Sequence, residues 1–324
     1  MSVLIYAENW DGKFKKLSFE LVSYAAALAA RLNCGVVALT IGNIAQEELQ
    51  KLSQYGAEKI LNVQDSRLNH LVNSTYASII AQAAQAEQAS VVLFAHNNAG
   101  KAIAPAVSVK LKAGLVSGVM AIPSSTEPFV VRKKVFTGKA FADIIVKAPI
   151  RVLTLSQNSF SVIEKPVTAA ISTFAAEISD ATITTSVKEV KKVTGKILLT
   201  DAEIVVSGGR GMKGPENWAP IEELAEILGA ATACSRPVAD EGWRPHGEHV
   251  GQTGKIIAPN LYFAFGISGA IQHLGGVSSS KCIVAINKDP DAPIFQAADY
   301  GILGDVQTVL PELITAVKEL KAQA

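Results

Sequence analysis

The chain has 324 residues, of which 49% are hydrophobic and 18% are charged, and its formal net charge is +1. This length suffices for two domains with sizeable cores, and the composition is that of a globular, soluble protein rather than a disordered one. The near-zero net charge gives no electrostatic reason to expect a nucleic acid or an anionic membrane as a partner.

Signals for export, membrane insertion and metal binding are weak or missing in the sequence. The opening "MSVLIYAENW" lacks a basic region, and no stretch approaches the roughly 18 apolar residues of a membrane span. Cys34, Cys234 and Cys282 lie far apart and form no C-x-x-C pair. His246 and His249 have an H-x-x-H spacing, but no cysteine or third ligand stands nearby. We therefore expect a cytoplasmic protein without a metal site.

The first half of the chain alternates short aliphatic runs with Ala-rich helical stretches. The aliphatic runs are typical of parallel strands that are buried on both faces. They predict strands over residues 3–7, 36–41, 59–63 and 91–95. The stretches between and after them predict helices over residues 18–33, 74–89 and 100–114.

The pattern changes at about Phe129. The segments "FVVRKKVFTGKAFADIIVK" and "IRVLTL" are rich in strand-forming residues with no helix between them, so we expect antiparallel pairing there. The polar stretch 176–196, "AEISDATITTSVKEVKKVTGK", has no strong helical pattern and is predicted to be a linker. We place the domain boundary near Lys191, which gives domains of residues 1–190 and 191–324.

A second α/β series follows the boundary. Residues 215–229 predict an amphipathic helix, with Trp218, Ile221 and Leu224 on one face and Gly229 as its C-cap. The predicted fold class is therefore α/β, with two domains that are each a doubly wound, mostly parallel sheet. The other predicted elements are strands over 203–207, 231–235, 256–258, 262–267, 282–287 and 300–304, and a final helix over 310–323.

Residues 209–214 form a G-x-G-x-x-G pattern between a predicted strand and a predicted helix, which is the context of a dinucleotide-binding loop. Tight strand-to-helix turns also use glycine simply for positive φ and close packing. The nicotinamide-binding form requires an acidic residue about 20 residues on, at the end of the next strand. Here that strand ends in Ser235 and Arg236. The sequence thus disfavours an ordinary NAD site, although an NAD-dependent dehydrogenase that uses this loop stays open as an alternative.

Several sequence blocks between Ile204 and Asp305 point to another nucleotide. In order they are "SGGRG", "SRPV", "VGQTGK", "GISGAIQH", "INKDPDAPIF" and "ADYGI". Together they resemble the signature of the electron-transfer flavoprotein α-subunit of bacterial type. The segments "VLIYAE" and "VFTGKAFADI" in the N-terminal half resemble, more loosely, the first domain of that family, which is similar in fold to the partner β-subunit.

The resemblance implies one FAD in the C-terminal domain, at the carboxyl ends of its parallel strands. Arg210 would bind the diphosphate as an always-charged fork donor. Ser235 and Arg236 would lie beside the flavin ring, and Thr253 would place its hydroxyl near the ring atom N5. His273 would reach the pyrimidine edge of the ring. Without the neighbouring blocks, these arginines and the histidine could equally be solvated, paired or buried for structural reasons.

The rest of the expected site surrounds the pyrophosphate and the adenosine. Residues 268–273 would open a helix whose free amides suit the pyrophosphate. Asn287, Asp305 and Val306 match positions that contact the adenosine half. The full expected cofactor-binding set is Arg210, Ser235, Arg236, Val250, Gly251, Gln252, Thr253, Ser268, Gly269, Ala270, Ile271, Gln272, His273, Asn287, Asp305 and Val306.

The function that the resemblance implies is electron transport by a flavoprotein, not substrate chemistry. No paired carboxylates or nucleophile motif point to an enzyme. Family members form a heterodimer with a β-subunit, which carries AMP in many members. They accept electrons from soluble flavin dehydrogenases, such as the acyl-CoA dehydrogenases of fatty acid β-oxidation, and pass them to a membrane-bound quinone reductase. A bifurcating or nitrogen-fixation-linked relative is the alternative within the family.

Overall fold

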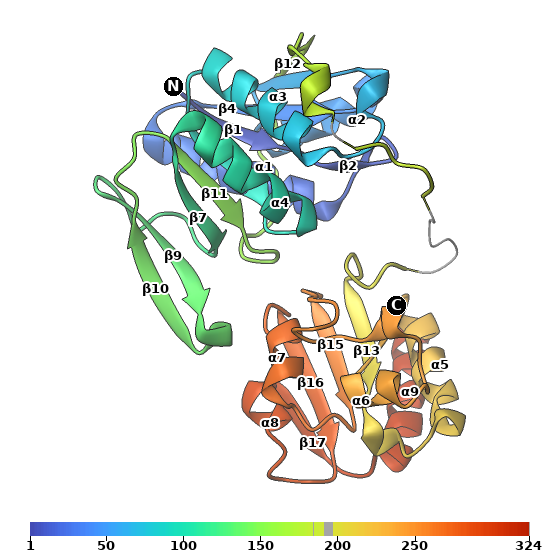
Figure 1. The fold of residues 1–324 in the computed structure, drawn as a ribbon. Coiled ribbons are helices and arrows are strands. Elements are labelled where there is room, and N and C mark those ends of the chain that lie inside the picture. The colour runs from blue at the N-terminus through green and yellow to red at the C-terminus, as the bar shows by residue number, and fades with distance from the viewer. Residues whose placement is uncertain (184, 191–196, 324) are drawn as a thin grey trace. The chain divides into compact units, whose positions relative to one another are not determined.

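The computed structural model describes residues 1–183, 185–190 and 197–323. The chain divides into two compact units, Met1–Val190 and Lys191–Ala324 (Figure 1). Each unit contains a mostly parallel sheet with helices on its faces, which confirms the predicted α/β class. None of the helices in the described ranges is both long and apolar enough to cross a membrane.

The first unit has a large mixed sheet whose central strands are parallel. Its strands follow the order β10-β9-β7-β11-β6-β1-β4-β5-β12, and β8 pairs with β9. Their bounds are β1 Ser2–Tyr6, β4 Gly35–Ile41, β5 Lys59–Val63, β6 Ala89–Ala95, β7 Gly114–Val119, β8 Ser125–Thr126, β9 Phe129–Val135, β10 Ala140–Ile145, β11 Arg151–Leu155 and β12 Ala170–Thr173, with a separate small hairpin of β2 Asn9–Trp10 and β3 Lys13–Phe14.

Helices cover both faces of this sheet because successive strand residues point to opposite sides. In β1, Val3 and Ile5 face the core that contains α1, whereas Leu4 and Tyr6 face the core that contains α3 and α4. This unit is therefore doubly wound, as predicted. Its helices are α1 Lys16–Leu32, α2 Gln46–Gln50, α3 Asn73–Ala86 and α4 Asn98–Leu111.

Two sequence expectations for the first unit need correction. The antiparallel prediction holds for β9 and β10 but is wrong for β11, which lies parallel between β6 and β7. Val152 and Leu153 of β11 are buried on opposite faces of the sheet, and only a central position buries both. The predicted linker is also shorter than expected, because Glu177 and Thr182 are hydrogen-bonded to Gln82 and Ser74 of α3. Residues 184 and 191–196 of that stretch lie outside the described ranges.

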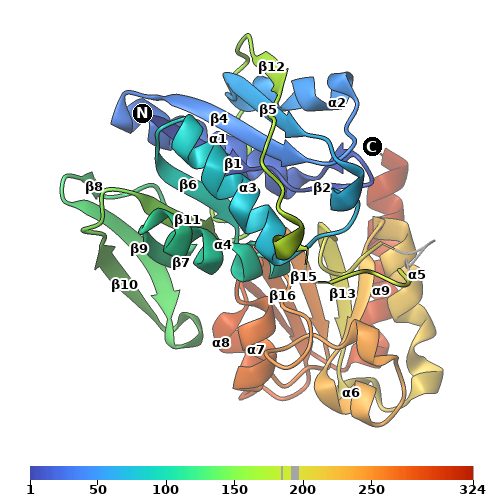
Figure 2. The ribbon, with the colours of Figure 1, turned by 45° about the horizontal axis from the view of Figure 1, so that its top comes forward.

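The second unit is a five-stranded parallel sheet in the order β14-β13-β15-β16-β17. The helices α5 and α9 lie side by side on one face (Figures 1 and 2), and α7 and α8 contribute to the core on the other face. The bounds are β13 Ile204–Gly208, α5 Ala219–Leu228, β14 Ala231–Cys234, α6 Arg236–Asp240, β15 Leu261–Phe265, α7 Ile271–Val277, β16 Cys282–Asn287, α8 Ile294–Ala297, β17 Tyr300–Leu303 and α9 Val306–Gln323.

The strand predicted over residues 256–258 is wrong. The main-chain N–H of Ile257 donates to the Gly276 carbonyl in α7 at 2.8 Å, and not to a neighbouring strand. Ile257 is fully buried beneath α7, so its apolar character reflects core packing rather than sheet pairing. An apolar triplet with no alternation cannot distinguish these two environments.

Candidate functional site

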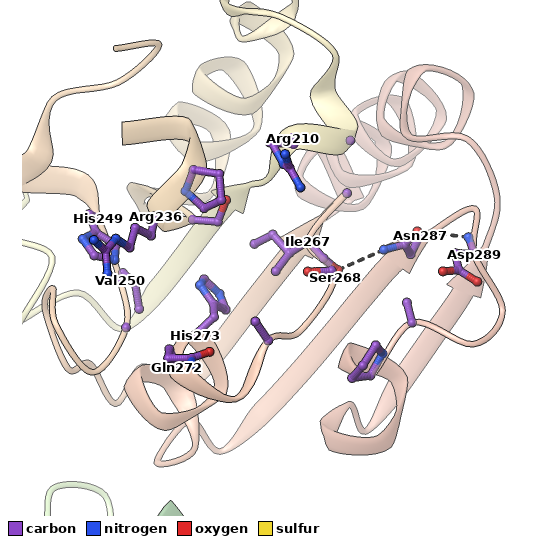
Figure 3. A pocket seen from close by; sticks show the side chains of 18 of the residues that line it. Arg210, Arg236, His249, Val250, Ile267, Ser268, Gln272, His273, Asn287 and Asp289 are labelled. Carbon is purple, nitrogen blue, oxygen red and sulfur yellow. Dashed lines mark hydrogen bonds between the residues drawn. The ribbon is translucent and has the colours of Figure 1, made fainter. Parts of the chain in front are cut away.

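A cavity of about 490 Å³ lies at the carboxyl ends of the parallel strands of the second unit (Figure 3). β14 lies on one side of β13, whereas β15, the next strand along the chain, lies on the other side. The strand order therefore reverses between β13 and β15. Open parallel sheets bind ligands at this reversal, outside the carboxyl ends of the strands. The cavity walls come from the segments that follow β13, β14, β15 and β16.

The glycine loop after β13 packs directly against the backbone that follows β15. A Cβ atom on Gly209 would lie 2.3 Å from the Gly266 carbonyl oxygen, and one on Gly211 would lie 2.6 Å from the Gly266 Cα. Gly266 itself has a φ of +61°. The α-helix α5 begins only at Ala219, so these glycines do not open it directly. Their geometric role is close packing of two loops that form one edge of the cavity.

Two arginines stand on the cavity wall (Figure 3). Arg210 is exposed, follows β13, and forms no ion pair within the described part of the chain. Arg236 begins α6, and its Nε lies 3.2 Å from Asp240 Oδ2 one turn later, as one of the structural alternatives anticipated. Both side chains of that pair are more than half exposed, at 63% and 53%. Exposed pairs contribute little stability, so the Arg236 guanidinium remains available to a ligand.

His273 on α7 is the buried polar group of the site. The residue is 6% exposed, and Nε2 of its ring lies 2.7 Å from the Tyr262 hydroxyl oxygen. Nδ1 is buried without a hydrogen-bond partner among the described residues. Burial lowers the pKa of His273 to about 4, while the nearby Val250 carbonyl offsets part of that effect and His249 adds to it. The ring is therefore neutral at pH 7, and its unpaired nitrogen suits a ligand, since buried polar atoms are nearly always paired.

His249 lines the same cavity, and sequence reasoning missed it. The main-chain carbonyl of His249 accepts from the Lys255 N–H at 2.9 Å, and His249 forms an isolated β-bridge with Cys234 at the end of β14. With these backbone contacts the residue is 8% exposed. Burial is the main cause that lowers its pKa. The available signal was its position directly before the "VGQTGK" block. Within the described ranges, no group of three or more His, Cys, Asp or Glu residues could hold a metal ion.

The cavity brings together most of the residues that the sequence singled out. Those on its walls are Arg210, Ser235, Arg236, Val250, Gly251, Thr253, Ser268, Ala270, Gln272, His273 and Asn287. The sequence did not anticipate the wall residues Gly211, Pro237, His249, Gly266, Ile267, Asp289, Ala292 and Pro293.

Five expected residues do not line this cavity. Gln252 is exposed, and its main-chain N–H donates to the Gln272 carbonyl at 2.8 Å. Gly269 has a φ of +85° and packs against the backbone of Ile294. Ile271 is 45% exposed at the start of α7. The remaining two, Asp305 and Val306, follow β17.

Asp305 and Val306 stabilise the start of α9. The Asp305 carboxylate accepts from the Gln307 main-chain N–H at 3.0 Å and lies 2.9 Å from Lys213 Nζ. The Gln307 N–H, followed by Lys213, lowers the pKa of Asp305. Val306 is buried beside Leu310 in the core under α5 and α9. These two residues therefore fix the segment next to the glycine loop rather than the cavity itself.

Comparison with known proteins assigns both units. Residues 3–185 match the electron transfer flavoprotein domain, and residues 198–278 match the electron transfer flavoprotein FAD-binding domain. The chain is 36% identical over 319 residues to the electron transfer flavoprotein subunit alpha of Bacillus subtilis, which covers 98% of both chains. The protein of that name from Thermoanaerobacterium thermosaccharolyticum is 35% identical, again over 98% of both. A protein named FixB from Clostridium saccharobutylicum is 33% identical over 98% of this chain and 96% of its own.

The sequence resemblance is thereby confirmed over nearly the whole length. The match to the electron transfer flavoprotein domain alone covers more than half of the chain. The match to the family's FAD-binding domain lies in the second unit of the chain. The chain belongs to the electron transfer flavoprotein subunit alpha family.

Proposed function

We propose that this chain is the FAD-carrying α-subunit of a heterodimeric electron carrier, and that the cavity of the second unit holds the flavin. The observation that carries the proposal is the cavity at the β13/β15 reversal, in a unit that matches the family's FAD-binding domain. Its volume of about 490 Å³ is within the usual range for small-molecule sites. When bound, FAD supplies the redox chemistry, and the protein supplies binding, orientation and electrostatics.

The residues present fit such a cofactor. Val250 and Ile267 offer apolar wall against a flat ring, while the unpaired nitrogen of His273 offers one hydrogen-bonding atom. Arg210, which is unpaired among the described residues, is proposed to bind the diphosphate. Arg236, from the neighbouring strand end, adds positive charge to the same wall. A site that combines apolar walls, two guanidinium groups and one buried neutral histidine suits an anionic nucleotide with an aromatic ring.

The roles of the remaining expected residues stay proposals. Ser235 and the segment 250–253, with Gly251, Gln252 and Thr253, are proposed to surround the ring. The segment 268–273 is proposed to bind the pyrophosphate, with Ser268, Gly269, Ala270, Ile271 and Gln272 contributing mainly through the backbone. Asn287, Asp305 and Val306 are proposed to lie toward the adenosine half. The Asn287 amide already donates to the Ile267 carbonyl at 2.9 Å, which couples the loops after β15 and β16.

We further propose that the first unit contacts a β-subunit, which would carry AMP. The hairpin of β9 and β10 exposes Phe136, Phe141 and Ile145 at 80%, 59% and 55%. Phe141, Asp143 and Ile145 are every second residue of β10, so the two apolar side chains share one face of the hairpin with Asp143 between them. Exposed apolar side chains gathered on one surface favour a protein partner.

The electron donors and the acceptor are proposed from the family alone. We propose soluble flavin dehydrogenases, such as the acyl-CoA dehydrogenases of fatty acid β-oxidation, as donors, a membrane quinone reductase as acceptor, and a cytoplasmic location. The similarity to FixB supports a second candidate, a bifurcating or nitrogen-fixation-linked relative. The NAD-dependent dehydrogenase is less well supported, because Arg236 stands where its acidic residue would be needed.

A visible absorption spectrum tests the central proposal. The chain is co-expressed with its β-subunit, and the purified complex is examined before and after addition of dithionite. A flavin band that bleaches on reduction, with about one FAD released per complex on denaturation, is the expected result. A colourless complex that binds NADH tightly would instead favour the dehydrogenase.

A further inference from the structure

Tyr262 and His273 form a hydrogen bond that lies beneath the cavity rather than in it. Tyr262 is the second residue of β15, and its side chain is fully buried. Its hydroxyl oxygen lies 2.7 Å from Nε2 of His273, and the two rings are tilted by 45° with centroids 6.1 Å apart. Tyr262 does not line the cavity, whereas His273 does. Any effect of the phenol on a ligand must therefore pass through the imidazole.

This contact determines which ring nitrogen can serve a ligand. Nε2 is already engaged by the phenol, so Nδ1 is the nitrogen that remains. Within the described residues, neither Nδ1 nor the neighbouring Ser207 hydroxyl makes a hydrogen bond of good geometry, although the Val250 carbonyl lies near the His273 ring and the Ser207 hydroxyl lies near the phenol. Ser207 is fully buried on β13, next to β15, and therefore cannot be satisfied by bulk solvent.

The position of the shared proton follows from the requirement that buried donors be paired. Burial raises the pKa of the Tyr262 phenol, and the nearby Ser207 hydroxyl offsets only part of that rise, so the phenol keeps its proton. If Tyr262 donates to Nε2, its own O–H is satisfied and the imidazole proton resides on Nδ1. If Nε2 carries the proton instead, the phenol O–H must turn from the imidazole toward the Ser207 hydroxyl, whose oxygen makes no well-formed hydrogen bond within the described part of the chain. That arrangement gives up about one ordinary hydrogen bond, which disfavours it by roughly 2- to 12-fold.

We infer that Tyr262 is a positioning residue, which holds His273 as a neutral imidazole with its proton on Nδ1, ready to donate to an acceptor atom of the bound ligand. The inference rests on the proposed flavin site, where the acceptor is a carbonyl oxygen or ring nitrogen at the edge of the isoalloxazine. A fixed neutral donor at that edge favours the reduced ring, because reduction adds negative charge there. Burial independently keeps the imidazole uncharged, since it lowers the pKa of His273 to about 4.

Nitrogen-15 NMR of the FAD-loaded heterodimer, labelled at histidine, tests this assignment directly. Long-range proton–nitrogen spectra distinguish the two tautomers, and a His273→Gln variant identifies the signals among the five histidines. We expect wild-type His273 to show a protonated Nδ1 and an unprotonated Nε2. The reverse pattern would overturn the inference, and this wild-type result needs no variant of Tyr262 to fold.

A Tyr262→Phe variant adds the functional readout, because it removes the hydroxyl and keeps the ring. We expect its His273 signals to move toward a tautomer mixture. The equilibrium constant for one-electron reduction of the flavin should fall by roughly 2- to 12-fold, the range for loss of one ordinary hydrogen bond. Wild-type values for both quantities would overturn the inference.

Two controls separate this role from general effects of substitution. Tyr76→Phe also removes a buried phenol hydrogen bond, to the Leu68 carbonyl at 3.0 Å, but in the first unit, and should change neither quantity. Ser207→Ala should also leave the His273 tautomer unchanged, because the serine accepts no proton in the inferred arrangement. A change of the His273 tautomer in Ser207→Ala would instead indicate that wild-type His273 carries its proton on Nε2. A complex without FAD would contradict the proposed function, whereas a yellow complex with the Nε2–H tautomer contradicts only this inference.

Discussion

Gly209 lies against Gly266 so closely that their backbones leave no room for a side chain, with 2.3 Å between a Cβ on Gly209 and the Gly266 carbonyl oxygen. The Gly209 N–H also donates to the Phe265 carbonyl at 2.8 Å. The loops after β13 and β15 are therefore in backbone contact at the point where the strand order reverses. Both the shape of the cavity and the position of Arg210 depend on this contact.

Substitution of Gly209 by alanine should separate these loops. Overpacking against backbone costs about 1–3 kcal/mol of unfolding free energy, and the displaced loop should also weaken FAD binding. Urea unfolding of the complex, followed by circular dichroism, measures the first effect. Gly247→Ala is the matched control, because nothing lies within 4 Å of its added Cβ and its φ is not positive. Equal unfolding midpoints for the two variants would show that the contact is unimportant.

Arg210→Ala should weaken FAD binding without altering the flavin spectrum. Loss of one charge-assisted contact is worth about 1.5–3 kcal/mol, or roughly 10- to 150-fold in the dissociation constant. Arg210→Lys should recover only part of the loss, because lysine lacks the planar fork. Lys318→Ala, which removes an exposed cation paired with Glu223 on the same unit, should leave binding unchanged. FAD titration of the deflavinated complex provides the constants, and an unchanged value for Arg210→Ala would make Arg210 an ordinary solvated arginine.

Arg236 and Asp240 should shift the flavin potential in opposite directions. A cation near the ring favours the reduced state, and at a partly open site the interaction is about 2 kcal/mol. Arg236→Ala should therefore lower the one-electron potential by about 90 mV. Asp240→Asn removes the carboxylate that partly neutralises the guanidinium, so it should raise the potential by a smaller amount. Reductive titration against reference dyes measures both, and shifts of the same sign would contradict placement of Arg236 beside the flavin.

The double variant Phe141→Ser with Ile145→Ser should weaken association with the β-subunit. Truncation of an apolar contact at the centre of an interface typically costs more than about 1 kcal/mol, so the dissociation constant should rise at least about 5-fold. Val109→Ser is a suitable control, because Val109 is 78% exposed on α4 of the same unit and lies away from the hairpin in sequence. Analytical ultracentrifugation of the complex at several concentrations distinguishes the variants. If Val109→Ser weakens assembly as much, the hairpin is not the specific contact.

His96 should make the first unit less stable in mild acid. Burial lowers the pKa of His96 to about 4, and Lys101 and Lys133 add to the effect. A folded-state pKa below the unfolded value of about 6.5 means that the unfolded chain binds more protons between these values. The stabilisation is thus fully present above pH 6.5 and is lost as the pH falls toward 4, by less than about 1.4 kcal/mol per pH unit since the ring is partly exposed.

Urea unfolding at pH 7.5 and pH 5 tests this dependence. The drop in unfolding free energy should be smaller in His96→Gln than in wild type, whereas His70→Gln, at an exposed position, should behave like wild type. Identical pH dependence in all three proteins would show that His96 does not take up a proton in this range.

Much of the fold was predictable because local composition reports burial. Aliphatic runs such as those of β1 and β4 identified central strands, and the amphipathic pattern of α5 identified a surface helix. The ordered blocks between Ile204 and Asp305 identified the family, since several motifs in the right order are unlikely to arise together by chance. Sequence alone therefore determined the fold class, the family and most of the residues that line the cavity.

The pairing of segments that are distant in sequence depended on the tertiary structure. Composition did not show that β11 enters the centre of the sheet, nor that Ile257 is buried beneath α7. Three further features also depend on contacts between separate elements. They are the position of His249 on the cavity wall, the Lys213–Asp305 ion pair and the Tyr262–His273 hydrogen bond. A residue's neighbours along the chain set its local conformation, but its hydrogen-bond partner is set by how the packed elements meet, and only the folded chain decides that.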